Sequence, residues 1–114
     1  MNALTEMTCV ACQVGAPKVT PAERDEFSQV IPDWESVTVD DVERLKRVFK
    51  LKNYTESLAF TNRVAQMAEV EDHHPLIVLE WGSVTVEWWT HKIHGLHKND
   101  FIAAAKTDVL FAQA

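Results

Sequence analysis

The sequence predicts a single α+β domain with elements in the order helix, two strands, helix, two strands, helix. Two helix-start signals, at residues 20–23 and 53–56, each precede a pair of strand-like segments, and 46% of the 114 residues are apolar. A chain of this length can bury one core without disulfides but is too short for two domains. We expect residues 1–19 to form an N-terminal arm and residues 20–114 to form the domain.

Charge and hydropathy exclude several classes of protein. The net charge of −6 provides no basic field for nucleic acid or for an anionic membrane surface. No apolar run approaches the roughly 18 residues of a membrane span, and the first residues lack the basic and apolar regions of a signal peptide. We therefore expect a cytoplasmic protein that contacts neither DNA directly nor a membrane.

The only cysteines, Cys9 and Cys12, form a Cys-x-x-Cys pair in the arm. A structural zinc site needs four ligands, and a redox pair normally lies between a strand and a helix. No strand-like segment precedes Cys9. We interpret both as small apolar side chains in an extended arm, and a thiol or metal role is the alternative.

The first half of the domain predicts one helix and one strand pair. Residues 20–23 read Thr-Pro-Ala-Glu, a capping box with proline at the first helical position. The helix is expected to stop at Pro32. Residues 34–39 and 44–51 alternate as strands do, and Asp40-Asp41 between them suits a turn.

A second capping signal at Asn53 opens the longest predicted helix, over residues 54–72. Pro75 disfavours helical backbone angles at His74, so this helix has to end near His73. One face of the helix is apolar, which predicts packing on a sheet. The predicted apolar face consists of Leu58, Phe60, Thr61, Val64, Ala65, Met67 and Ala68.

A hairpin follows, with strands at 76–81 and 84–89 and Gly82-Ser83 as a two-residue turn with glycine first. With this turn, Trp81 lies opposite Val84, and the same strand pairing continued outward places His74 opposite His91. Directly opposed residues have Cβ atoms about 5 Å apart. The hairpin therefore predicts two imidazoles side by side.

The last predicted helix covers residues 98–111. His97 occupies its N-cap position, where Ser or Thr would be expected, and this substitution weakens a cap by about 1 kcal/mol. Asp100 in the first turn is favoured by the helix dipole.

All five histidines lie between residues 73 and 97, which marks this region as the candidate site. Glu69 precedes His73 by one helical turn and shares its face. A carboxylate and a helix C-terminus favour a protonated imidazole, as general acid catalysis requires, and such catalysis contributes about 10²–10⁴-fold. Asp72 is a second candidate partner. The alternative is a surface histidine that caps the helix end.

A metal site is the main rival for these histidines. Gly95 and the change from strand to loop at Thr90 argue against a helix that would align the later histidines. His73 and His74 are neighbours and cannot easily bind one ion, and the His-Glu-x-x-His zinc motif is absent. We therefore expect no metal. The later histidines recur every third residue, as His91, His94 and His97.

These residues form a composite motif that resembles the signature of the pterin-4a-carbinolamine dehydratases. The resemblance extends at least from Trp34 to Leu110 and includes the pairs Thr90-His91 and Gly95-Leu96. The residues that match the signature are Glu69, His73-His74-Pro75, Trp81, His91 and Asp100.

The resemblance implies a two-layer fold, with helices on one face of a four-stranded antiparallel sheet, that assembles as a homodimer or homotetramer. It also implies dehydration of 4a-hydroxytetrahydrobiopterin, the 4a-carbinolamine, to quinonoid dihydropterin and water. This reaction recycles the cofactor of aromatic amino acid hydroxylases, which are candidate partners. No metal or organic cofactor is required.

The family's functional residues fall on matching positions of this chain. His73, His74 and His91 are expected to be the catalytic imidazoles, which protonate the departing hydroxyl and accept the N5 proton. The resemblance implies that Asp100 supports His91. Trp89 shares a face with His91 and is expected to line the pocket, whereas Trp88 faces the core. The supporting residues are Glu69, Asp72 and Asp100, and the substrate-binding residues are Pro75, Trp89 and Thr90.

Two other functions fit the same sequence. The chain could be a relative of these dehydratases that acts on another pterin, such as a molybdopterin. The chain could also be a protein-binding dimerisation module, because family members act as coactivators of a homeodomain transcription factor. The histidine cluster favours the enzyme, since a pure scaffold has no physical need for it.

Overall fold

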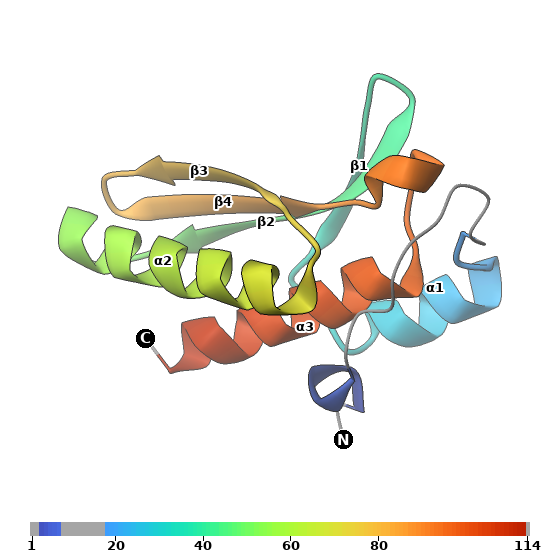
Figure 1. Cartoon of the computed structure of the whole chain (residues 1–114), viewed down its shortest axis with the longest axis horizontal. Coiled ribbons are helices and arrows are strands. Elements are labelled where there is room, and N and C mark those ends of the chain that lie inside the picture. The colour runs from blue at the N-terminus through green and yellow to red at the C-terminus, as the bar shows by residue number, and fades with distance from the viewer. Residues whose placement is uncertain (1–2, 8–17, 114) are drawn as a thin grey trace.

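The computed structural model describes residues 3–7 and 18–113, which form a layer of helices beneath a four-stranded sheet (Figure 1). The strands pair antiparallel in the order β1-β2-β4-β3. The strands are β1 (Glu35–Val39), β2 (Val42–Lys50), β3 (Leu76–Glu80) and β4 (Ser83–Trp88). The α-helices are α1 (Pro21–Ser28), α2 (Tyr54–Glu71) and α3 (Lys98–Ala112), and the short 3₁₀ helices are η1 (Ala3–Glu6) and η2 (His91–Ile93). The predicted α+β class and element order are confirmed.

Both capping signals in the first half of the domain form as predicted. The Thr20 hydroxyl accepts a hydrogen bond from the Glu23 backbone at 3.1 Å, and the Glu23 carboxylate accepts one from the Thr20 backbone at 2.9 Å. The Asn53 side chain accepts from the backbone of Glu56 at 2.9 Å. Helix α1 ends at Ser28, before the proline that we expected to stop it.

The core lies between the inner face of the sheet and helices α2 and α3. Along β4, Val84, Val86 and Trp88 alternate with more exposed residues and are completely buried. On α2, Phe60 and Val64 are completely buried, whereas Leu58 of the predicted apolar face is 43% exposed. The apolar face of α2 is therefore narrower than the sequence pattern suggests. No helix among the described residues is both long and apolar enough to cross a membrane.

The two hairpins differ in how well the sequence predicts them. Asp40 and Asp41 form the first turn with φ of 50° and 64°, as expected. In the second hairpin Glu80 pairs with Ser83, so Trp81 and Gly82 form the turn. The predicted register, with Trp81 opposite Val84, is wrong by two residues. The second position of this turn has a positive φ, 72°, which glycine adopts readily. Gly82 therefore takes the second position of the turn and not the first.

Helix α3 begins with an unusual capping box. The Nδ1 atom of His97 accepts from the Asn99 backbone at 3.1 Å, and the Asp100 carboxylate accepts from the His97 backbone at 2.8 Å. His97, expected to be a weak cap, thus makes both bonds of the box.

The arm also differs from its prediction. Residues 3–6 form η1 rather than an extended segment, and Leu4 is only 3% exposed in the core. Helix η1 packs against α3. Cys9 and Cys12 lie outside the described residues.

Candidate active site

His73 occupies a buried position where α2 leads into β3. Asp72 ends the helix in the left-handed conformation, with φ of 52°. The His73 imidazole is 8% exposed and stacks on Trp88, with ring centroids 5.3 Å apart and ring planes inclined by 22°. Its Nε2 atom lies 2.7 Å from Oδ1 of Asp100. The ring is therefore fixed in position by an indole and a carboxylate.

Asp100 joins three parts of the chain and is completely buried. Its Oδ1 atom contacts His73, and its Oδ2 atom accepts from the Thr90 hydroxyl and from the His97 backbone, both at 2.8 Å. The resemblance predicts a contact with His91, whereas the carboxylate contacts His73 instead. A carboxylate only accepts hydrogen bonds, so His73 donates from Nε2 and keeps Nδ1 for other chemistry.

His74, the next residue, has a different environment. Its Nε2 atom lies 2.6 Å from Oε1 of Glu69, and the two side chains are 56% and 77% exposed. The sequence paired Glu69 with His73, one helical turn away, and that pairing is wrong. The left-handed Asp72 breaks the helical spacing, and Glu69 reaches His74 instead.

His91 lies in η2, just past the end of β4, and is exposed. Its ring centroid is 4.6 Å from that of Trp89, which confirms that these two residues share a face. The Arg44 guanidinium lies over the Trp89 ring, with Cζ 3.8 Å from the centroid. The sequence did not single out Arg44, because only the pairing of β2 with β4 reveals this contact.

The predicted pairing of His74 with His91 does not form. The observed register ends with Leu76 opposite Glu87, and continued by two residues it points His74 towards Trp89. No hydrogen bond or ring contact links His91 to His73 or to His74 among the described residues. The three imidazoles thus occupy one buried and two exposed positions near the ends of α2 and β4.

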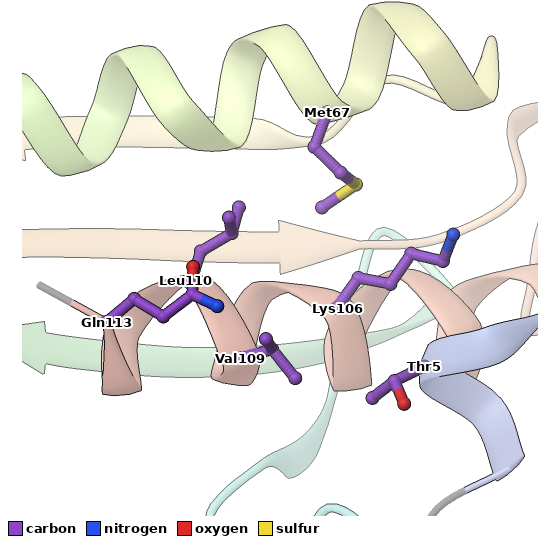
Figure 2. A pocket seen from close by; sticks show the side chains of 6 residues that line it. All are labelled: Thr5, Met67, Lys106, Val109, Leu110 and Gln113. Atoms are coloured by element: carbon purple, nitrogen blue, oxygen red, sulfur yellow. The ribbon is translucent and has the colours of Figure 1, made fainter.

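A separate cavity of about 250 Å³ lies between α2, α3 and η1 (Figure 2). None of the five histidines lines it, so it is distinct from the candidate site. Its walls are mainly apolar. The residues that line the cavity are Thr5, Met67, Lys106, Val109, Leu110 and Gln113.

The described residues do not group as metal ligands do. Within residues 3–7 and 18–113, no three His, Cys, Asp or Glu side chains come close enough together to hold an ion. Two of the imidazoles instead form separate pairs with carboxylates, His73 with Asp100 and His74 with Glu69.

Comparison with known proteins identifies close relatives. The chain is 56% identical over 110 residues to a protein of Syntrophotalea carbinolica assigned as a pterin-4-alpha-carbinolamine dehydratase, covering 96% of this chain and 98% of the relative. It is 53% identical over 111 residues to a protein of Marinobacter nauticus with the same assignment, covering 97% and 100% of the two chains.

A solved structure has the same fold. The transcriptional coactivator/pterin dehydratase of Brucella melitensis superposes with a TM-score of 0.73 at 29% identity, over 82% of this chain and 98% of that one. The family model for pterin 4 alpha carbinolamine dehydratase matches residues 17–110. This match and the two relatives, each more than half identical over nearly the whole chain, show that the chain belongs to the pterin-4a-carbinolamine dehydratase family.

Proposed function

We propose that this protein dehydrates a 4a-hydroxytetrahydropterin to the quinonoid dihydropterin and water. The carbon–oxygen bond at C4a breaks, the N5 lone pair forms the new double bond to C4a, and the N5 proton leaves. The reaction needs one group to protonate the leaving hydroxyl and one to accept the N5 proton. Imidazoles supply both functions near neutral pH.

The observation that carries this proposal is the contrast between the buried imidazole and the exposed ones. His73 is fixed by Asp100 and Trp88, so it can present Nδ1 in one orientation at little entropic cost. His74 and His91 are exposed and can exchange protons with bulk water after each turnover. A site with one oriented imidazole and two accessible ones suits a reaction that only moves protons.

We assign supporting roles to the groups around these imidazoles. Glu69 orients His74, and Asp100 orients His73 through its hydrogen bond. Asp72 sets the direction of the chain at the histidine pair through its left-handed backbone. We further assign substrate contacts to three residues near the histidines: Pro75, Trp89 and Thr90.

Assembly, location and partners belong to the same proposal and come from the family resemblance. We expect a homodimer or homotetramer in the cytoplasm that works beside an aromatic amino acid hydroxylase. A second candidate function is protein binding, because the structural relative from Brucella melitensis is named a transcriptional coactivator as well as a pterin dehydratase.

A direct assay tests the proposed dehydratase activity. The 4a-hydroxytetrahydropterin is generated in situ by an aromatic amino acid hydroxylase, and its dehydration is followed by absorbance with and without a chelator. We expect rapid dehydration by the wild type, indifference to the chelator, and loss of at least tenfold in His73→Ala, His74→Ala and His91→Ala. A wild type no faster than the uncatalysed reaction would overturn the proposal.

A further inference from the structure

We infer that Arg44 is a positioning residue for the proposed dehydratase and acts on His91 through Trp89. This inference rests on the proposed function. It starts from the outer face of the sheet, which is the face turned away from α2 and α3. Strands β2 and β4 pair with Leu45 opposite Trp88, so Arg44 and Trp89, one step further along, face each other on that outer face.

The guanidinium is fixed more firmly than a surface arginine usually is. Its Nη1 atom lies 3.0 Å from Oε1 of Glu87, and the two side chains are only 16% and 12% exposed. Its Nε atom is buried without a hydrogen-bond partner among the described residues. Arg44 is therefore held by one carboxylate at its end and by the indole of Trp89 beneath it.

The contact with Trp89 is the kind that a planar cation makes. The Arg44 Cζ atom lies 3.8 Å from the centroid of the indole, well within the range of a cation–π interaction. Lysine has no planar group that could stack in the same way. Arg44 and Glu87 together thus hold the indole in one orientation.

The indole in turn lies against His91. The two ring centroids are 4.6 Å apart and the ring planes are inclined by 32°. His91 belongs to a 3₁₀ helix of only three residues, is itself exposed, and makes no hydrogen bond through its side chain among the described residues. The Trp89 ring is therefore the group that orients this imidazole, and Arg44 orients Trp89.

A double-mutant cycle tests whether Arg44 acts through Trp89. We expect Arg44→Ala to lower kcat about threefold to tenfold, the range that loss of one cation–π contact allows. In a Trp89→Ala background the same substitution should change kcat by less than about twofold, because Arg44 would have nothing left to orient.

Two further variants separate positioning from general effects. Arg44→Lys keeps the charge and should recover less than half of the lost kcat, since it cannot stack as a plane. Lys50→Ala, on the same outer face at the far end of β2, is the matched control and should keep wild-type kcat. Equal losses from Arg44→Ala with and without Trp89 would overturn the inference.

A spectroscopic measurement keeps the inference testable even if the wild type has no dehydratase activity. The imidazole protons of His91 lie in the ring current of Trp89, so their NMR shifts report the relative orientation of the two rings. Arg44→Ala should move these shifts and Lys50→Ala should not. Unchanged His91 shifts in a folded Arg44→Ala variant would overturn the inference, whereas an inactive wild type alone would overturn only the proposed function.

Discussion

His73 and His74 are neighbours in the chain, but the fold treats them in opposite ways. His73 is 8% exposed and lies against a completely buried carboxylate, whereas the His74 side chain is 56% exposed and is paired with a carboxylate that is 77% exposed. Each imidazole nevertheless has one carboxylate oxygen within 2.7 Å. The comparison teaches that the same pair of groups can serve as part of the core or as part of the surface, depending on what surrounds it.

The energetic consequence follows from solvation. A buried carboxylate that loses its donors is left in an environment where no water replaces them, whereas an exposed carboxylate is rehydrated at once. We therefore expect substitutions on the His73 side to affect both folding and activity, and those on the His74 side to affect activity alone.

The largest effect is expected from Asp100→Ala. This change leaves the His73 Nε2, the Thr90 hydroxyl and the His97 backbone without their acceptor, and should cost about 3 kcal/mol of the free energy of unfolding or more. Urea unfolding at pH 7 measures it. Glu69→Ala, the matched truncation at the exposed pair, should cost less than about 0.5 kcal/mol. Equal costs at the two sites would refute the comparison.

The next largest loss of stability is expected when the histidines themselves are replaced. His73→Ala removes the stacking on Trp88 and one hydrogen bond to Asp100, which should destabilise the fold by about 2 kcal/mol. His74→Ala should change stability by no more than about 0.5 kcal/mol. Thermal or urea unfolding of both variants, measured beside their dehydratase rates, distinguishes a folding role from a chemical one. If His74→Ala proved less stable than His73→Ala, the expectation that the buried histidine contributes more to folding would be wrong.

A smaller effect is expected from Thr90→Val, which keeps the shape of the side chain but removes the hydroxyl that donates to Asp100. The loss should be about 1 kcal/mol in the free energy of unfolding. Thr85→Val on β4, at a position turned away from the buried side of the strand, is the control and should be near neutral. If the two valine variants are equally stable, the hydrogen bond from Thr90 to Asp100 does not stabilise the fold.

The smallest effect concerns an ion pair away from the histidines. The hydrogen bond from Arg24, and less strongly that from Ser36, hold the pKa of Glu43 below its usual value of 4.5. A lowered pKa in the folded state means that this stabilisation is complete above pH 4.5 and is lost as the pH falls through the lowered value. Glu43→Gln should therefore cost less than about 1 kcal/mol at pH 7, and the cost should be smaller at pH 3. Unfolding of both proteins at the two pH values tests this.

The sequence predicted the elements of the fold well because their signals are local. The caps at Thr20 and Asn53 depend on residues three positions apart, and the structure has both. The turn at Asp40-Asp41 is equally local. The hairpin register was missed because the sequence does not say whether Gly82 takes the first or the second turn position, and the structure uses the second.

The partners of the site residues were harder to predict than the residues themselves. The motif singled out His73 and Asp100, but their contact spans 27 residues along the chain and depends on how α3 packs under the end of β4. Glu69 was assigned to the wrong histidine because a helical spacing was continued past the end of the helix. Arg44 carries no signal in a single strand, since its contact with Trp89 is made across the sheet.

Asp100 has a further consequence for how the molecule opens. Its two oxygens join the end of α2, the end of β4 and the start of α3 through His73, Thr90 and His97. None of these segments can separate from the others without exposing a buried carboxylate. Backbone amides in all three segments should therefore exchange with deuterium at a common slow rate, as one cooperative unit. Fraying of any one segment would disturb the position of the buried imidazole as well.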